Sequence, residues 1–454
     1  MGKNLAEKML RKTGNNNQLT MLSTLEEQLN RKHPLYVLAK EITWKRFEEA
    51  FQKHYHEKLG RPGKPIRLMV GLIILKHIRN LSDESIVEQW SENTYYQYFC
   101  GMESFVAAEP CEASELVHFR NRIGKEGLEL IFKESVKING KDGKEKEVVV
   151  DTTVQEKNIT FPTDDKLYKK IINKTVTIAE KEGIELRQSY KRTVKKLSYQ
   201  QRFKRSKKQR KISQKASRKI KTIAGRLVRD IERKLTAEAL TRHSVSIELF
   251  KRVIRQKRED SNKIYSLHEP AVQCISKGKE HKKYEFGNKV SIMLTKTTGV
   301  IVGALSLEKN DYDGHTMKPA LEQYKKFYEK EPIKAIADLG YRGITKIGET
   351  EIITPNKKGK TKSEKIKLRN SHRRRSSIEA NISHLKNNHR LNRNFYSKII
   401  GDEMNVLLSA AAYNFKRMMR KWKDAIKNFL FLFYSTLKII FVPLNIIRKL
   451  KLSF

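Results

Sequence analysis

One segment of the sequence combines residue types that could bind a metal ion and phosphate on the same helical face. If HRRRSSIEANISHLK forms a helix, steps of three or four residues place five side chains on one stripe: His372, Arg375, Glu379, Ile382 and Lys386. Only Ile382 in this stripe is apolar. The Glu379 carboxylate, which lies between bases, could ligate a metal ion near a polyanion while Arg375 and Lys386 hold phosphate oxygens.

Two aspartates are candidates to join Glu379 in a metal site. Asp151 follows the apolar run 148–150, and Asp338 follows a second apolar run at 333–337. A buried strand that ends at such a residue releases its last side chain into a crevice. Both positions therefore suit a ligand to a metal ion.

Other polar residues compete for the same role. Asp311 and Asp313, in the segment NDYDGH, are rival metal ligands. The alternative interpretation is an Asx-type turn closed by Gly314, because Asp side chains often bond to the backbone two residues later. His384 and His389 have no metal-ligand partner at a useful spacing, and we expect both at the surface.

The acidic residues and their flanking bases resemble the catalytic core of the DDE transposases of bacterial insertion sequences. The residues that match are Asp151, Asp338, Glu379, Arg375 and Lys386. The insertion sequence family five branch is similar over about residues 35–414, through the phrases DTTVQEKNITFPTD, SLHEPAVQCISKGK, YEFGNKVSI, YDGHTMKP and IADLGYRG. One position departs from the family pattern, which has a tyrosine where His372 stands.

The resemblance implies a ribonuclease-H-like catalytic domain that cuts and joins double-stranded DNA. In such a site two Mg2+ ions, roughly 3.5 to 4 Å apart, strengthen the water nucleophile and stabilise the leaving oxygen. Asp151 would bridge both ions, while Asp338 and Glu379 would each hold one, and Mn2+ could substitute. A DNA 3′-hydroxyl could then replace water, which converts hydrolysis into strand transfer. Without the resemblance, the residues indicate only a metal-dependent nuclease centre.

The net charge favours a nucleic-acid partner. The 454 residues include 95 lysines and arginines against 51 acidic residues, which gives a formal net charge of +44. This excess is larger than solubility requires, and cationic side chains gain free energy by displacing counterions condensed on nucleic acid. Charge alone does not distinguish DNA from RNA. With the resemblance, the expected partners are transposon ends, target DNA and a second copy of the chain in a homodimer.

Cysteine usage and the N-terminal segment predict the compartment. The three cysteines have no metal-binding spacing and cannot all pair, which fits a reducing environment. Residues 1–20 are polar and lack the continuous apolar core of a signal peptide. We therefore expect a cytoplasmic, nucleoid-associated bacterial protein.

The sequence pattern, with the resemblance, predicts an α/β fold: a ribonuclease-H-like mixed sheet with a helical N-terminal domain and a basic helical insertion. The predicted parts are a polar leader (1–33), a helical domain that binds DNA ends (34–140), a catalytic domain (141–414) and an apolar C-terminal tail (415–454). The helical domain could equally be an ordinary helix bundle. A strand around Asp151, a hairpin over residues 289–307 and a strand before Asp338 would place the two aspartates on neighbouring strands.

A basic helical insertion at about residues 166–258 interrupts the predicted catalytic domain. Apolar residues from Ile220 to Leu235 recur every three or four positions, which predicts a helical hairpin or coiled coil. We predict DNA-phosphate contacts from Lys204, Arg205, Lys207, Lys208, Arg210 and Lys211. The alternative for this run is a solvated helix face. Arg342, in the segment GYRG, could reach donor phosphates or stabilise a turn.

The C-terminal tail and the overall function each leave alternatives. Lys438 and Pro443 interrupt the apolar run of the tail, so a membrane partner is not expected. A packed or dimer-forming helix is favoured, and an aberrant tail of a decaying mobile element is the alternative.

For the whole chain, a DNA transposase is the preferred interpretation, and a catalytically inactive basic DNA-binding protein is the second.

Overall fold

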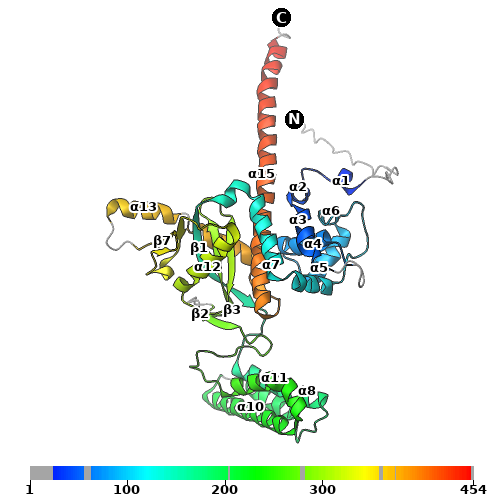
Figure 1. Cartoon of the computed structure of the whole chain (residues 1–454), viewed down its shortest axis with the longest axis vertical. Helices are drawn as coiled ribbons and strands as arrows, with labels where there is room; N and C mark the ends of the chain where they lie inside the picture. The colour runs from blue at the N-terminus through cyan, green and yellow to red at the C-terminus, as the bar shows by residue number, and fades with distance from the viewer. Residues whose placement is uncertain are drawn as a thin grey trace, which may run out of the picture.

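The chain forms two parts that flank one long C-terminal helix and a third part that lies away from it. The computed structural model describes residues 24–55, 63–202, 205–276, 282–356, 361–373 and 375–450, with side chains up to residue 426. Figure 1 shows N-terminal helices on one side of the long helix, a sheet on the other side, and a separate group of helices at the far end from the C-terminus. This arrangement confirms the predicted α/β class with a mixed sheet, N-terminal helices and a helical insertion.

Within the described residues, seven α-helices precede the sheet. They are α1 (Leu25–Gln28), α2 (Pro34–Glu41), α3 (Trp44–Gln52), α4 (Ile66–Arg79), α5 (Asp83–Glu92), α6 (Thr94–Phe99) and α7 (Ala113–Ile138). The apolar α4 is buried along most of its length. A single hydrophobic core joins these helices to the sheet, and it includes Phe47, Trp90, Val149 and Leu407. The N-terminal helices are therefore packed on the catalytic part through shared apolar burial.

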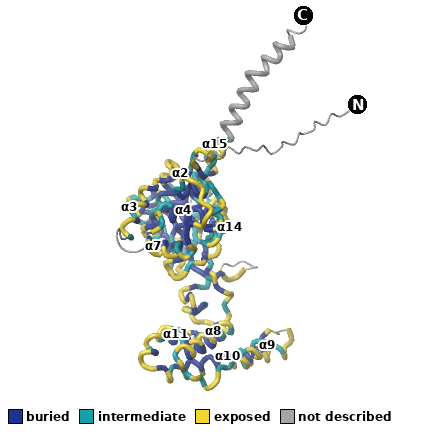
Figure 2. The backbone as a smooth tube through the Cα atoms, turned by 90° about the vertical axis from the view of Figure 1, so that its right-hand side faces the viewer, coloured by how far each residue is buried: buried dark blue, intermediate teal, exposed yellow. Residues whose placement is uncertain are grey.

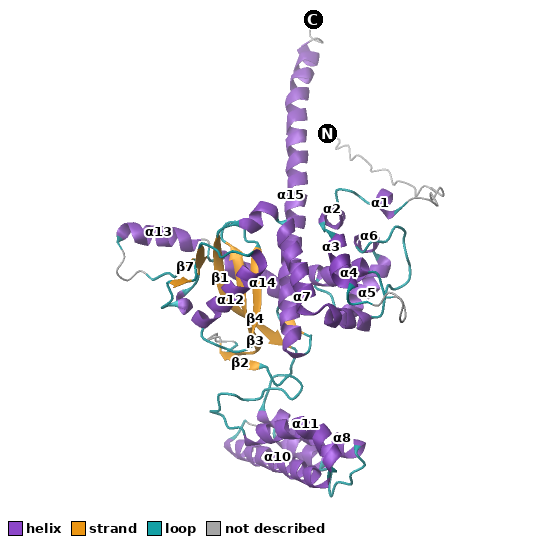
Figure 3. Cartoon of the chain, viewed as in Figure 1, coloured by secondary structure: helices purple, strands orange, loops and turns teal. Residues whose placement is uncertain are grey.

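The sheet is mixed, and its two central strands carry the candidate site. Its strands are β1 (Glu147–Lys157), β2 (Gln273–Ser276), β3 (Tyr284–Thr295), β4 (Ile301–Leu307), β5 (Lys334–Ile336), β6 (Lys346–Ile347), β7 (Thr350–Ile353) and β8 (Arg393–Asn394). The strand order is β2-β3-β1-β5-β7-β6, with β4 paired to β3 and β8 to β1. β3 and β4 form the predicted hairpin, β1 is antiparallel to β3, and β1 is parallel to β5 (Figure 3). This order is consistent with the ribonuclease-H-like core that we expected.

β1 is longer than the apolar run that predicted it, so Asp151 does not end a strand. The antiparallel ladder with β3 continues from Val148 to Glu156. Polar side chains in the second half of the strand find buried partners: Lys157 Nζ lies 2.6 Å from the Asp402 carboxylate. The strand continues because these partners satisfy its polar residues, and the predicted strand end at Asp151 is wrong.

Four elements cover or flank the sheet. They are η1 (Gly140–Lys144), α12 (Asp313–Tyr328), η2 (Leu339–Tyr341) and α15 (Lys398–Leu450). α12 packs on β4, and α15 packs against α7, α4 and β4. The predicted boundary at residue 415 falls inside α15, so the tail continues a helix that begins in the sheet domain. In the part of the chain that the structure describes, no helix has the length and hydropathy that crossing a membrane requires.

The segment 372–386 forms two helices instead of the single predicted helix. α13 (Lys362–Arg373) ends before Arg375, and α14 (Ser377–Asn388) begins after it. The bonds from Arg375 N to His372 O and from Ile378 N to Arg375 O tighten the chain between the two helices. Ile378 is fully buried in the core and fixes the start of α14. The predicted five-residue stripe is therefore broken, and His372 lies on a different helix from Glu379.

The basic insertion is a helical bundle with a core of its own, which we call the arm (residues 164–255). It comprises α8 (Asp164–Lys181), α9 (Lys191–Gln200), α10 (Lys207–Lys234) and α11 (Ala237–Arg255). Ile220, Ile223 and Leu227 of α10 are buried in this second core, against α8 and α11. Figure 2 shows the arm set apart from the main body, with buried and exposed segments along its helices. A four-helix bundle replaces the predicted hairpin or coiled coil because α8 and α9 also cover the apolar stripe of α10.

Candidate active site

The pairing of β1 with β5 places Asp151 beside Asp338. The two strands are parallel, and Val149 of β1 stands opposite Ile336 of β5. Two residues further along both strands, the same register brings Asp151 level with Asp338. The prediction that these aspartates come from neighbouring strands is confirmed, although Asp151 lies within its strand and only Asp338 follows the end of one.

The two carboxylates converge on one cationic group. The Thr152 amide donates to Asp151 Oδ1 at 2.8 Å, and the Gly340 amide donates to Asp338 Oδ1 at 2.8 Å. These bonds orient each carboxylate and leave its Oδ2 atom for another partner. Arg375 Nη2 lies 3.4 Å from Asp151 Oδ2 and 3.6 Å from Asp338 Oδ2. The site therefore contains one position where two carboxylate oxygens face the same positive charge.

Burial disfavours the ionised form of the Asp151 carboxylate. The pKa of Asp151 is raised to about 6, chiefly by the loss of hydration on burial and to a smaller extent by the charges of Asp338 and Asp313. The Thr152 amide and the Arg375 guanidinium act in the opposite direction and lower this pKa. Because the guanidinium does not compensate the burial, the site still favours added positive charge.

A third aspartate supports the pair from the side. Asp313, the first residue of α12, accepts hydrogen bonds from Thr152 Oγ1 at 2.8 Å and from Lys289 Nζ at 3.1 Å. These contacts tie α12 to β1 and β3, so the Asp313 side chain bridges strands instead of closing the predicted Asx-type turn. A Cβ atom at Gly340 would lie 2.8 Å from Asp338 Oδ1 and 3.1 Å from Asp313 Oδ2. Both carboxylates therefore pack around a glycine that cannot carry a side chain without movement.

Glu379 does not reach the aspartate pair in this structure. It lies in the first turn of α14, and its side chain is exposed. α14 packs on β1 through the buried Ile378 and Leu385, which places the helix beside the site. Among the described residues, no three histidine, cysteine or acidic side chains are arranged to hold a metal ion. Asp151 and Asp338 provide two carboxylate oxygens that face one position, as binding of a divalent cation requires. The carboxylate of Glu379 does not lie with them in this structure.

The predicted phosphate contacts lie in four places. Arg375 is half-buried at the aspartate pair, Arg342 is exposed directly after η2, and Lys386 lies near the end of α14. In the arm, the exposed basic residues are Arg205, Lys207, Lys208, Arg210 and Lys211, at the start of α10. Lys204 lies outside the described residues. Cations at a helix N-terminus oppose the helix dipole, so helix stability does not explain this basic run.

The arm also contains an arginine cluster that sequence reasoning missed. Arg187, Arg226, Arg229 and Arg233 line a hollow of about 760 Å3 beside Tyr190. Three of these arginines recur in α10 at steps of three and four, which was the available signal for a shared face. Arg187 comes from the segment before α9 and could be placed there only by the packing of the arm.

Comparisons with known proteins match two parts of the chain. Residues 23–122 match the family model "Transposase domain (DUF772)", which covers most of the N-terminal helices. Residues 254–415 match the model "Transposase DDE domain", which contains Asp338 and Glu379. Asp151 and most of the arm lie between the two matched segments.

One curated relative matches over most of its own length. It is the "Uncharacterized protein ORF8 in nfe locus" of Rhizobium meliloti, which is 46% identical over 183 residues, 39% of this chain and 88% of the relative. No solved structure matches the chain. The two matched transposase domains, the mixed sheet and the paired aspartates agree with one another, and the chain belongs to the DDE transposases of insertion sequences.

Proposed function

We propose that this transposase binds the terminal inverted repeats of its element and catalyses metal-dependent strand cleavage and strand transfer there. The observation that carries this proposal is the convergence of Asp151 Oδ2 and Asp338 Oδ2 on one position, now held by Arg375 Nη2. Oxygen donors that face a shared cation are what a hard divalent ion requires. The family uses divalent metals, and Mg2+, two ions per site, is our choice, with Mn2+ able to substitute.

The carboxylates would hold the metal ions, with Asp151 shared between them and Asp338 and Glu379 each on one. Bound metal would activate the attacking oxygen and stabilise the leaving oxygen of the phosphodiester. The chain's own contribution is to orient the donors: the Thr152 and Gly340 amides fix the two aspartates. Glu379 would join them by a movement of the first turn of α14, which follows directly on the break at Ser376.

Arg375 has a second role in this proposal. Its guanidinium now offsets the negative charge of the aspartate pair. Metal ions would supply that charge instead, and Arg375 would then hold a phosphate oxygen of the substrate. Arg342 and Lys386 would contact neighbouring phosphates, because both lie on segments that adjoin the aspartate pair.

DNA binding away from the active site would use the arm and the N-terminal helices. The basic start of α10 and the arginine hollow give the arm two positively charged surfaces for the DNA backbone. The N-terminal helices would recognise the ends, and a homodimer would hold two ends together. Residues 34–140 and 141–414 remain our proposed limits for the end-binding and catalytic domains.

Cleavage of a labelled duplex that carries the gene's flanking ends tests this function. We expect cuts at the element boundary with Mg2+ or Mn2+, and none with Glu379→Gln, although this variant should bind the duplex as the wild type does. The control is Glu322→Gln, which removes one carboxylate on α12 without touching the aspartate pair. Loss of both binding and cleavage in Glu379→Gln would count against a catalytic role for this residue.

One observation favours a second candidate, a catalytically inactive DNA-binding protein. Glu379 is exposed, and the described residues contain no three-carboxylate site. This candidate predicts salt-sensitive binding of the flanking ends with no metal-dependent product. Terminal inverted repeats close to the coding ends would favour the active enzyme instead.

A further inference from the structure

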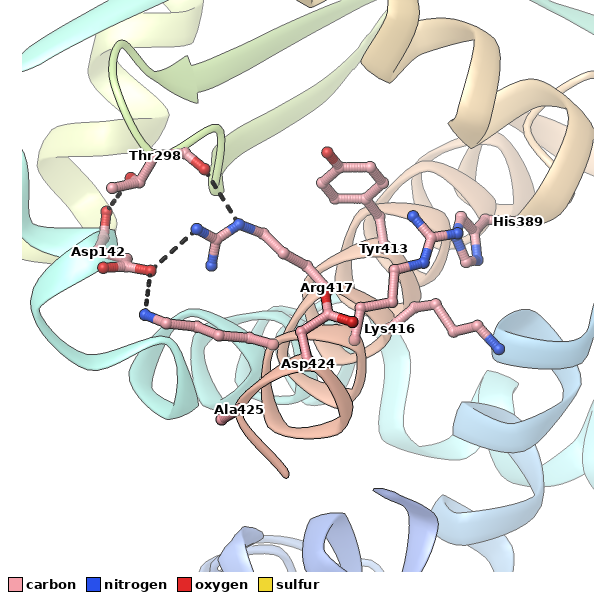
Figure 4. A pocket seen from close by; sticks show the side chains of 10 residues that line it. Asp142, Thr298, His389, Tyr413, Lys416, Arg417, Asp424 and Ala425 are labelled. Atoms are coloured by element: carbon pink, nitrogen blue, oxygen red, sulfur yellow. Dashed lines mark hydrogen bonds and ion pairs between the residues drawn. The ribbon is translucent and has the colours of Figure 1, made fainter. Parts of the chain in front are cut away.

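A basic cavity lies on α15, away from the aspartate pair. It has a volume of about 670 Å3 and is formed where α15 meets η1, the β3–β4 turn and the residue that follows α14 (Figure 4). Four cationic side chains of α15 line it: Lys416, Arg417, Arg420 and Lys421.

On one side of the cavity, two of these cations pair with a single carboxylate. Asp142 accepts from Arg417 Nη2 at 2.9 Å and from Lys421 Nζ at 2.9 Å, as the dashed lines in Figure 4 show. Arg417 is held further by bonds to Thr298 O at 3.0 Å and Asn139 Oδ1 at 2.7 Å. This side of the cavity is a structural joint between η1, the β3–β4 turn and α15.

The other side carries two cations, Lys416 and Arg420, and Asp424, which follows Arg420 by four residues, also lines the cavity. Among the described residues, no carboxylate lies within ion-pair distance of Lys416 or Arg420, and Lys416 is half-buried. Burial lowers the pKa of Lys416, and the charges of Arg79, Arg420 and Lys423 lower it further. Arg79 belongs to the last turn of α4, so the cationic group spans the N-terminal helices and α15.

A neutral histidine also lines the cavity. His389, which we expected at the surface, is buried, with only 2% of its surface exposed. Its Nδ1 donates to the carbonyl of His77 at 3.1 Å, because a carbonyl can only accept. Burial and the neighbouring cations lower the pKa of His389 to about 4, so the ring carries no charge at neutral pH. Lys416 and Arg420 therefore face a cavity whose two carboxylates, Asp142 and Asp424, form no ion pair with either cation among the described residues.

We propose that this cavity binds a phosphate of the DNA backbone, with Lys416 and Arg420 as the contacts. A cluster of like charges, in which Lys416 is half-buried and Arg420 is exposed, is unfavourable by itself, and a phosphodiester supplies negative charge. The location suits this role, since Arg79 ends a helix of the matched N-terminal transposase domain and His389 follows α14, which carries Glu379. A phosphate held here would fix the DNA relative to both the N-terminal helices and α14. The identity of the polyanion as DNA rests on the proposed function.

Salt dependence of DNA binding tests this site. Each phosphate contact contributes about 0.9 to the slope of log Kobs against log salt, so losing two contacts lowers its magnitude by about 1.8. We expect this change in Lys416→Ala/Arg420→Ala, measured by fluorescence anisotropy on the flanking-end duplex from 50 to 200 mM salt. The matched control is Lys330→Ala/Lys346→Ala, which removes two exposed lysines that have no carboxylate partner among the described residues.

Other outcomes would overturn the inference. An unchanged slope, or an equal decrease in the control, would show that the two residues do not contact the DNA backbone. A wild-type thermal shift with pyrophosphate that the variant loses, together with an unchanged DNA slope, would show a site for small phosphates instead. If the alanine variant does not fold, Lys416→Gln/Arg420→Gln provides the same measurement. Asp338→Asn separates this inference from the proposed function, since it should abolish cleavage and keep the full salt slope.

Discussion

Replacing Asp151 with asparagine should stabilise the metal-free protein. Burial raises the pKa of Asp151 from its ordinary value of 3.8 to about 6, so the native state pays for an ionised carboxylate at neutral pH. At about 1.4 kcal/mol per pKa unit, this difference corresponds to about 3 kcal/mol. Asparagine keeps an oxygen that can accept from the Thr152 amide and carries no charge. The variant should therefore recover up to about 3 kcal/mol.

The gain should depend on pH in a defined direction. Between about pH 4 and pH 6 the native state binds a proton at Asp151 that the unfolded state has released, so the wild type loses stability as the pH rises through this window. Above pH 6 the full penalty is present, and below pH 4 it is absent. Asp151→Asn should therefore gain most at pH 7.5 and little at pH 4.

Thermal unfolding with a chelator present measures this effect. For a unit of 150–250 residues, about 3 kcal/mol corresponds to a rise of roughly 6–12 °C in Tm. The control is Asp311→Asn, because Asp311 is an exposed aspartate two residues before α12. A Tm that is unchanged at pH 7.5, or a rise of equal size at pH 4, would refute the assigned burial penalty.

Two further substitutions probe the packing of the site and of the N-terminal helices. Gly340→Ala should abolish cleavage, because a Cβ there would lie 2.8 Å from Asp338 Oδ1 and 3.1 Å from Asp313 Oδ2. DNA binding, measured by anisotropy, should stay intact. Normal cleavage by this variant would contradict the reasoning. Asp83→Asn should destabilise the protein by about 3–5 kcal/mol in denaturant unfolding, because it leaves Arg120, whose side chain is only 3% exposed, without its charged partner. A loss below about 1 kcal/mol would show that the buried pair contributes little.

The sequence predicted the local elements well where hydrophobic periodicity was strong. The hairpin of β3 and β4 and the helix α4 formed where the patterns indicated, because strand alternation and helical spacing are local properties of the chain. The strand before Asp338 was also identified by its apolar run and its polar end. The candidate carboxylates could be selected in this way, since each was tied to one local element.

Longer-range contacts decided the features that the sequence did not predict. β1 continued beyond Asp151 because Lys157 found the buried Asp402 carboxylate 245 residues away in sequence. The helix predicted over 372–386 broke because Ile378 packs in the core while Arg375 turns to the aspartates. Neither contact leaves a signal at neighbouring positions, so no periodicity could reveal it.

The sequence by itself determined the residue chemistry of this transposase: three candidate carboxylates, a large excess of basic charge and the order of strands and helices. Only the tertiary structure decided which charges meet. It paired Asp151 with Asp338 on Arg375, left Glu379 exposed, and gathered Lys416 and Arg420 near Arg79. The physical reason is that hydrophobic pattern acts over a few residues, whereas electrostatic partners are chosen by the packing of a shared core.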